Sequence, residues 1–292
     1  MIALIRKKIK KFSYDDRELN FEQKKGIIDQ LSGGNYRIDF SGGELLIDPL
    51  NVDLICYASE KLGKENIGIS VSGAFINDKL INKLKDRIHD VEITLDYVPF
   101  KPYKLRPVGY HEYAAHAIQK LKRKNIYVGA QTVLTNENIA FEKIDQLFGW
   151  LVKNNVDDWR ILRFLPSGRG ESYRFLTPTH LQYCEAVSYI KKISQKSNVN
   201  ISFQYLLPNH DKYTLKCRSV KKSIGILPNG MVTACFWALD RNMIPKDNSF
   251  ILGKLPDENI KDILTSEKAL KWKNNCMNCK IFTKESLEKE II

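Results

Sequence analysis

Hydrophobic and polar residues follow two rhythms along the first two-thirds of the chain. Short apolar runs with the character of strands alternate with longer stretches in which apolar residues recur every three or four positions, the spacing of one helix face. Strands are expected at 36–40, 67–71, 91–95, 126–134 and 159–165. Helices are expected at 21–31, 52–62, 78–84, 110–121 and 141–152. This alternation predicts βαβ units and an α/β fold with a parallel, barrel-like sheet.

The rhythm changes near residue 177. The expected elements are then a helix at 180–194, a strand at 200–206, hairpin arms at 223–227 and 231–237, and a helix at 260–271. Asn229-Gly230 at the hairpin turn supplies the positive φ angles that a tight turn requires. We therefore expect a barrel domain over 1–209 and a small hairpin and helix module over 210–292.

Four of the six cysteines lie in the C-terminal module, and their spacing indicates a metal site. They are Cys217, Cys235, Cys276 and Cys279. One cysteine precedes the hairpin, one follows it, and a C-x2-C pair completes the set. Four thiolates are the ligand set of a structural zinc site or of a [4Fe–4S] cluster, and spacing alone does not choose between them.

A second motif directly follows the first clear strand. It reads Asp39-Phe40-Ser41-Gly42-Gly43-Glu44, and Asp48-Pro49 then opens a helix. Glycines at a strand end let a ligand approach the backbone, and a carboxylate beside them can receive an ammonium group.

The stretch RIDFSGGELLIDP resembles the Gly-Gly-Glu turn of the radical S-adenosylmethionine (SAM) superfamily. The likeness covers residues 20–175 in the correct order, with Leu45 where the family usually has proline. It implies a partial (β/α)6 TIM-like barrel whose first strand is short or missing, with residues 1–5 as its only remnant. It also implies SAM as a cofactor. The residues that it marks for cofactor binding are Ser41, Gly42, Gly43 and Glu44, with Ser72, Asp96 and Thr132 as further candidates for cofactor or substrate contacts.

The late cysteines extend the resemblance. The pattern C-x12-G-x4-C with a later C-x2-C is similar to the Twitch module, the shortened form of the SPASM domain that follows radical SAM barrels. This likeness implies one auxiliary [4Fe–4S] cluster held by all four cysteines, with a role in electron transfer or structural support.

One family feature does not occur in the sequence. Radical SAM enzymes hold their SAM-cleaving cluster with a C-x3-C-x2-C motif upstream of Gly-Gly-Glu, whereas no cysteine precedes Cys56 here. Two explanations stay open. The chain is a shortened form of an active enzyme, or it is a degenerate homologue that has lost SAM cleavage. The catalytic residues are unknown in either case.

Three functions follow from these observations. The first is a radical SAM oxidoreductase or maturase that modifies a peptide, protein or small molecule and receives electrons from a donor such as flavodoxin or ferredoxin. The second is a non-catalytic partner protein with the same scaffold. The third, a zinc-stapled nucleic-acid-binding protein, draws on the net charge of +12 and the four cysteines.

Charge and hydropathy narrow the choice among these functions and the expected location of the protein. The basic residues form short groups separated by acidic ones, and no RNA-binding signature is visible, which argues against nucleic acid. No apolar run reaches the roughly 18 residues of a membrane helix, and the N-terminal charge order does not fit a signal peptide. We therefore expect a cytoplasmic protein that is not embedded in a membrane.

Overall fold

The computed structural model of the chain forms two compact units. The residues that it describes are 18–204, 207, 219–240, 242 and 244–274. One unit comprises 34–217 with 276–292, and the other comprises 1–33 with 218–275. The expected domain boundary between 209 and 210 and the expected strand remnant at 1–5 fall outside the described residues, so both stay predictions.

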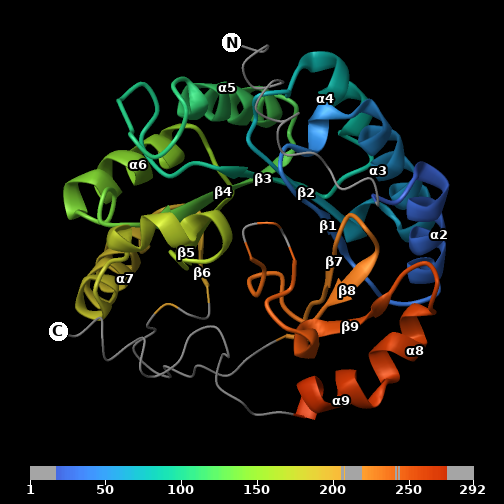
Figure 1. The fold of residues 1–292 in the computed structure, drawn as a ribbon. Coiled ribbons are helices and arrows are strands. Elements are labelled where there is room, and N and C mark those ends of the chain that lie inside the picture. The colour runs from blue at the N-terminus through green and yellow to red at the C-terminus, as the bar shows by residue number, and fades with distance from the viewer. Residues whose placement is uncertain (1–17, 205–206, 208–218, 241, 243, 275–292) are drawn as a thin grey trace. The chain divides into compact units, whose positions relative to one another are not determined.

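Six parallel strands form the sheet of the larger unit, in the order β1-β2-β3-β4-β5-β6 (Figure 1). Their bounds are Ile38–Phe40 (β1), Ile67–Val71 (β2), Asp90–Thr94 (β3), Tyr127–Leu134 (β4), Asp158–Arg163 (β5) and Asn200–Phe203 (β6). All six were expected from the apolar runs. The predicted α/β class with a partial barrel is confirmed.

The helices of this unit follow the strands and lie along one face of the curved sheet (Figure 1). They are α3 (Pro49–Leu62), α4 (Asp78–Leu84), α5 (Tyr110–Lys122), α6 (Phe141–Lys153) and α7 (His180–Ser194), with short 3-10 turns η1 (Leu45–Ile47), η2 (Lys64–Asn66) and η3 (Gly168–Leu176). Within the part of the chain that the structure describes, no helix has the length and apolar character needed to cross a membrane.

Strand alternation separates an apolar face of the sheet from a polar one. In β3 and just after it, Val91, Ile93 and Leu95 are fully buried, while Glu92 and Thr94 between them are half-buried. The apolar side packs against the helices and forms the core. The opposite side, here called the inner face, carries polar side chains.

Helix α3 shows how local sequence sets the loop after β1. Asp48 caps the helix by accepting from the Leu50 N–H at 3.0 Å, and Pro49 occupies the first helical position. The helix ends at Gly63, whose φ of 83° suits glycine. The predicted helix start at Asp48-Pro49 is confirmed, and it fixes where the preceding Gly-Gly-Glu loop must end.

The smaller unit contains a three-stranded antiparallel sheet in the order β7-β8-β9. Its elements are α2 (Phe21–Ser32), β7 (Gly225–Ile226), β8 (Met231–Thr233), η4 (Asn248–Phe250), β9 (Ile251–Lys254), α8 (Ile260–Thr265) and α9 (Glu267–Asn274). The predicted hairpin corresponds to β7 and β8. Gly230 at its turn has φ 83°, and a Cβ there would stand 1.9 Å from the Leu255 carbonyl oxygen, so this position requires glycine.

Helix α2 belongs to this smaller unit, although the sequence pattern placed it with the barrel helices. Leu19, just before the helix, donates its N–H to the Pro228 carbonyl at 2.9 Å. Gln30 of α2 accepts from the Ile260 N–H at 2.9 Å and donates to the Glu258 carbonyl at 3.3 Å. These bonds tie the helix to the segments around β8, β9 and α8.

Candidate functional site

The loop that the sequence singled out follows β1 directly. Ser41, Gly42 and Gly43 are exposed, and Glu44 is half-buried. Gly42 has a φ of +151°, which residues with a Cβ rarely adopt, and apart from its chain neighbours no atom of the described residues lies within 4 Å of where its Cβ would stand. The loop therefore leaves open space beside its backbone for a ligand.

Glu44 is bound by Ser72, which follows β2. The Ser72 N–H donates to Glu44 Oε2 at 3.1 Å, and the Ser72 hydroxyl donates to the same oxygen. Glu44 Oε1 is buried and has no hydrogen-bond partner among the described residues. A buried carboxylate oxygen without a donor costs free energy. This oxygen is therefore suited to accept from an amino or ammonium group of a ligand.

Asp96 follows β3 and is only 3% exposed. Its Oδ2 accepts from Arg106 Nε at 2.7 Å, and its Oδ1 accepts from the Val133 N–H at 2.9 Å. Burial lowers the pKa of Arg106, but the negative charge of Asp96 outweighs burial and the net shift is upward. The Asp96 carboxylate is thus satisfied by the protein, and its role in this structure is to hold Arg106 as a cation.

Tyr110, the first residue of α5, links the Glu44–Ser72 pair to the Asp96–Arg106 pair. The Arg106 guanidinium carbon lies 5.0 Å from the centroid of the Tyr110 ring. Burial raises the pKa of Tyr110, and the negative charge of Glu44 acts in the same direction. The side-chain hydrogen bond of Tyr110 with Thr94 acts in the opposite direction. The strand ends of β1, β2 and β3 therefore form one site with the start of α5.

Two aromatic side chains lie beside Arg106 and Asp96. The ring centroids of Tyr103 and His111 are 5.2 Å apart. His111 is 3% exposed, and its Nε2 has no partner among the described residues. Burial lowers the pKa of His111 and raises the pKa of Tyr103 to about 12. Both side chains are therefore neutral near pH 7.

Thr132 does not join this site. It is 1% exposed, and its hydroxyl donates to the Leu95 carbonyl at 2.7 Å while accepting from Trp159 Nε1 at 2.8 Å. The hydroxyl is fully used inside the core between sheet and helices. Its neighbour Gln131 lies on the inner face, where it donates to Glu92 Oε2 at 3.3 Å. The expected ligand contact of Thr132 has no support here, because strand alternation turns the side chain away from the inner face.

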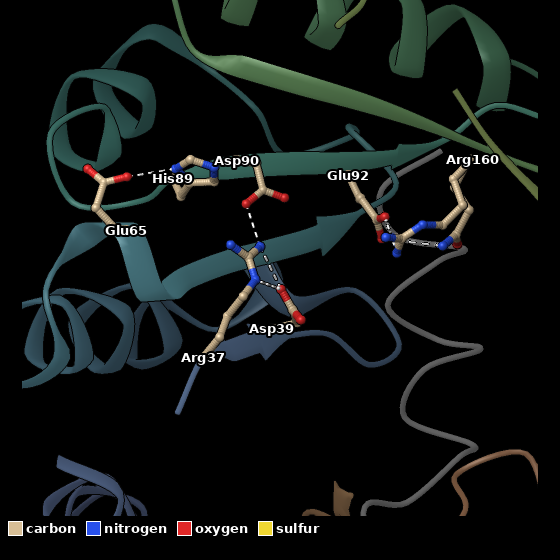
Figure 2. Close-up of polar contacts among 8 residues, drawn as sticks. Arg37, Asp39, Glu65, His89, Asp90, Glu92 and Arg160 are labelled. Atoms are coloured by element: carbon tan, nitrogen blue, oxygen red, sulfur yellow. Dashed lines mark hydrogen bonds and ion pairs between the residues drawn. The ribbon is translucent and has the colours of Figure 1, made fainter. Parts of the chain in front are cut away.

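A group of ion pairs lies on the inner face, here called the charged layer: Arg37, Asp39, Asp90, Glu92 and Arg160 (Figure 2). Arg37 donates to Asp39 Oδ1 at 2.8 Å and to Asp90 Oδ1 at 2.5 Å. Arg160 Nη1 lies 2.6 Å from Glu92 Oε1. Burial raises the pKa of Glu92, which Arg160 partly counteracts. The inner face is thus polar and charged, not a packed apolar interior.

A glycine in β2 makes part of the charged layer possible. Arg37 reaches from the start of β1 to Asp90 of β3, and Gly68 of β2 pairs in register with both Asp39 and Asp90. A Cβ on Gly68 would stand 2.3 Å from Arg37 Nη2 and 2.4 Å from Asp39 Oδ1. The guanidinium therefore occupies the space that a side chain on β2 would fill.

Arg106, Tyr110 and the charged layer were not predicted as site residues, although Asp39 of that layer opens the Gly-Gly-Glu motif. Arg106 and Tyr110 lie in a loop and at a helix start, where apolar periodicity gives no orientation. The charged layer did leave a signal, since Asp90 and Glu92 alternate with apolar residues along one strand. Such alternation identifies the polar face but not the partners across neighbouring strands.

The predicted metal ligands fall in the C-terminal part of the chain. Cys235, two positions after β8, is 7% exposed. Its N–H donates to Thr233 Oγ1 at 3.3 Å, and the Thr233 hydroxyl is 3.2 Å from its carbonyl oxygen. Cys217, Cys276 and Cys279 lie outside the described residues. Among described side chains no group of three or more possible ligands gathers, so the four-cysteine site stays a prediction.

Comparison with known proteins gives matches in both parts of the chain. The family described as SPASM, an iron–sulfur cluster-binding domain, matches residues 217–281, which include all four predicted ligands. A GTP 3',8-cyclase from Clostridium perfringens (strain SM101 / Type A) is 23% identical over 184 residues, which are 62% of this chain and 56% of that protein. The chain thus spans little more than half the length of this curated relative.

Solved structures share the fold at low sequence identity. SuiB from Streptococcus suis, bound to its precursor peptide SuiA, superposes with a TM-score of 0.68 at 12% identity, covering 86% of this chain and 59% of SuiB. The protein anSMEcpe, with bound AdoMet and the Kp18Cys peptide, gives a TM-score of 0.66 at 12% identity, covering 87% of this chain and 74% of anSMEcpe.

The partial barrel, the Gly-Gly-Glu loop at its strand ends and the matched C-terminal region point to one class of protein. In fold the chain is similar to the SAM-binding proteins SuiB and anSMEcpe, and in sequence to a GTP 3',8-cyclase, which is a resemblance to the radical SAM superfamily. The C-terminal part of the chain is a SPASM domain, the iron–sulfur cluster-binding domain of the matched family.

Proposed function

We propose that the chain binds SAM at the ends of β1, β2 and β3 and serves in the radical modification of a peptide or protein substrate. The observation that carries this proposal is the buried Oε1 of Glu44, which lacks a partner while Oε2 is held by Ser72. When bound and reduced by one electron, SAM would supply hydrogen-atom abstraction from the substrate, as in radical SAM enzymes. The residues of the chain bind and orient it.

The site residues fit the methionyl end of SAM by charge and donor type. Glu44 Oε1 offers an acceptor for the amino group. Arg106, held by Asp96, offers a cation for the carboxylate, and guanidinium–carboxylate pairs are among the stronger charge-assisted hydrogen bonds. The open space beside Gly42 permits close approach of the ligand to the backbone.

The SPASM domain contributes the auxiliary cluster. Cys217, Cys235, Cys276 and Cys279 are its proposed ligands, and four thiolates complete a [4Fe–4S] cluster without an open iron. The buried position of Cys235 after β8 is consistent with a shielded cluster. A flavodoxin or ferredoxin as electron donor also stays part of the proposal.

A peptide substrate is supported by two observations. Structures of SuiB and anSMEcpe with bound peptides share the fold of this chain. The inner face carries the charged layer, which suits a polar substrate segment better than an apolar one.

The amino-acid end of SAM provides a direct test. Isothermal titration calorimetry would compare SAM with 5'-methylthioadenosine, which has the nucleoside and sulfur but lacks the amino and carboxylate groups. We expect SAM to bind at least about tenfold more tightly, since each charge-assisted bond contributes roughly 1.5–3 kcal/mol. Equal affinities would contradict the assigned roles of Glu44 and Arg106.

A second candidate function is a non-catalytic partner protein with the same scaffold. After anaerobic cluster reconstitution and addition of reductant, formation of 5'-deoxyadenosine by this chain would exclude the second candidate. SAM binding without any 5'-deoxyadenosine would favour it.

A further inference from the structure

A cavity of about 290 Å³ lies between the loop after β2 and helix α5. Gly73 and Ala74 line it from the loop, and Tyr113 lines it from the helix. Gly73 has φ +90°, and a Cβ there would stand 2.9 Å from the Cβ of Ala117, so glycine is required for the loop to approach α5 this closely. The volume is near the lower end of small-molecule sites, which span about 300–1,000 Å³.

The α5 side of the cavity carries three basic side chains, His116, Lys120 and Arg123. Spacings of four and three residues place them along one side of the helix. Within the described residues none of the three has an ion-pair partner, and the described residues that line the cavity include no aspartate or glutamate. The cavity therefore concentrates positive charge that no ion pair among the described residues neutralises.

A lysine of α5 that does not line the cavity, in contrast, has an ion-pair partner. Lys122 pairs with Asp157 Oδ2 at 2.5 Å. The helix macrodipole favours cations in the last turn, which accounts for Lys120 in part. It does not account for His116, which lies before the last turn, nor for a cavity beside all three side chains.

We propose that this cavity binds the phosphate group of a small metabolite. A phosphate monoester is a dianion, which matches the two permanent cations Lys120 and Arg123, and the Arg123 guanidinium can donate two parallel bonds to its oxygens. His116 adds a third donor. Tyr113 offers an aromatic wall for the organic part of the ligand. Gly73 and Ala74 of the cavity lining directly follow Ser72 in the chain, but none of the described residues that line the cavity belongs to the Gly-Gly-Glu loop.

Calorimetric titration of the purified chain with two probes tests the proposal. Inorganic phosphate and adenosine monophosphate would be titrated at constant ionic strength with chloride as the compensating anion. We expect saturable one-site binding of at least one probe, weakened tenfold or more in Lys120→Glu/Arg123→Glu. Equal affinities would mean that the phosphate group alone is recognised, and tighter binding of adenosine monophosphate would mean that the organic part also contributes.

Lys192→Glu/Lys196→Glu is the matched control, because it makes the same charge change at exposed residues at and just beyond the end of α7. This control is expected to bind as the wild type does. Equal weakening in both double variants would show a general effect of net charge and would overturn the proposal. Absence of saturable binding of either probe to the wild type would also overturn it. Circular dichroism melts confirm that each variant is folded.

Discussion

Ser72 donates both its backbone N–H and its hydroxyl to one oxygen of Glu44, Oε2, and leaves the other oxygen of that carboxylate buried without a donor. The pair joins the ends of two adjacent parallel strands, where barrel folds bind their ligands. Ser72 therefore orients Glu44, and the unpaired Oε1 is the acceptor that a ligand can use.

Removal of the Ser72 hydroxyl is expected to weaken SAM binding. In Ser72→Ala, Glu44 loses one of two bonds that fix its orientation, so we expect an affinity loss of about three- to tenfold, the size of one such hydrogen bond. Ser70→Ala is the matched control, because Ser70 lies in β2, two residues before Ser72, and has the same side chain. An unchanged SAM affinity in Ser72→Ala would show that the hydroxyl does not position Glu44.

Thr132→Val is expected to affect stability and not ligand binding. Valine keeps the shape of threonine but leaves the buried Trp159 Nε1 and the Leu95 carbonyl without their hydroxyl partner. We expect the free energy of unfolding in urea to fall by about 1–3 kcal/mol, with SAM affinity unchanged in calorimetry. A large loss of SAM affinity with normal stability would instead place Thr132 in the cofactor site.

His111 predicts a specific pH dependence of stability. Burial lowers its pKa from the ordinary value of 6.5, so the folded state binds fewer protons than the unfolded state once the pH falls below that value. The stabilisation present above pH 6.5 is therefore lost as the pH drops towards the folded pKa, with a slope of at most about 1.4 kcal/mol per pH unit.

Urea unfolding of the wild type and of His111→Phe between pH 5 and 8 measures this effect. The variant is expected to lack the decline below pH 6.5 that one proton produces. His116→Phe, an exposed position on the same helix, serves as the control and should keep the decline. Parallel pH profiles for the wild type and His111→Phe would show that His111 is not the group that titrates.

Two glycines of the inner face are expected to differ in their tolerance of alanine. In Gly68→Ala the new Cβ would collide with Arg37 Nη2 at 2.3 Å, so we expect a loss of about 1–3 kcal/mol in unfolding free energy. In Gly129→Ala the nearest atom is Glu92 Cγ at 3.4 Å, and we expect a change within about 0.5 kcal/mol.

The cause of the Gly68 effect can be isolated with a double variant. Arg37→Ala removes the side chain that fills the space above Gly68, so the cost of Gly68→Ala should shrink in that background. Equal costs in both backgrounds would show that backbone conformation, and not the Arg37–Asp90 contact, requires glycine at this position.

The apolar rhythm predicted all six parallel strands, because burial on one sheet face imposes alternation that survives in the sequence. The hairpin was predictable from Asn229-Gly230, and in the structure Gly230 has the positive φ angle of the turn. Strand β9 was missed: it has four residues, and Gly253 within it carries no side chain to mark a face. The unit to which α2 belongs could not be predicted from the pattern either. An amphipathic helix shows that one of its faces is buried but not which surface buries it.

The site residues also divide into those that the sequence could identify and those that it could not. The Gly-Gly-Glu loop was recognisable because its chemistry is local. The parity of β4 could have excluded Thr132, which shares its face with the buried Val128, Ala130 and Leu134. The ion pair of Arg106 with Asp96 joins a loop to a strand end ten residues away, and only the three-dimensional structure brings the two together.

The most direct measurement is the SAM affinity of Glu44→Gln, determined by titration calorimetry beside the wild type and Thr132→Val. Glutamine keeps the size of glutamate but removes the charge that would pair with the methionyl ammonium. We predict SAM binding to the wild type and to Thr132→Val, with an affinity at least about tenfold lower in Glu44→Gln. Equal SAM affinity in the wild type and Glu44→Gln, or no binding to any of the three, would contradict the assignment.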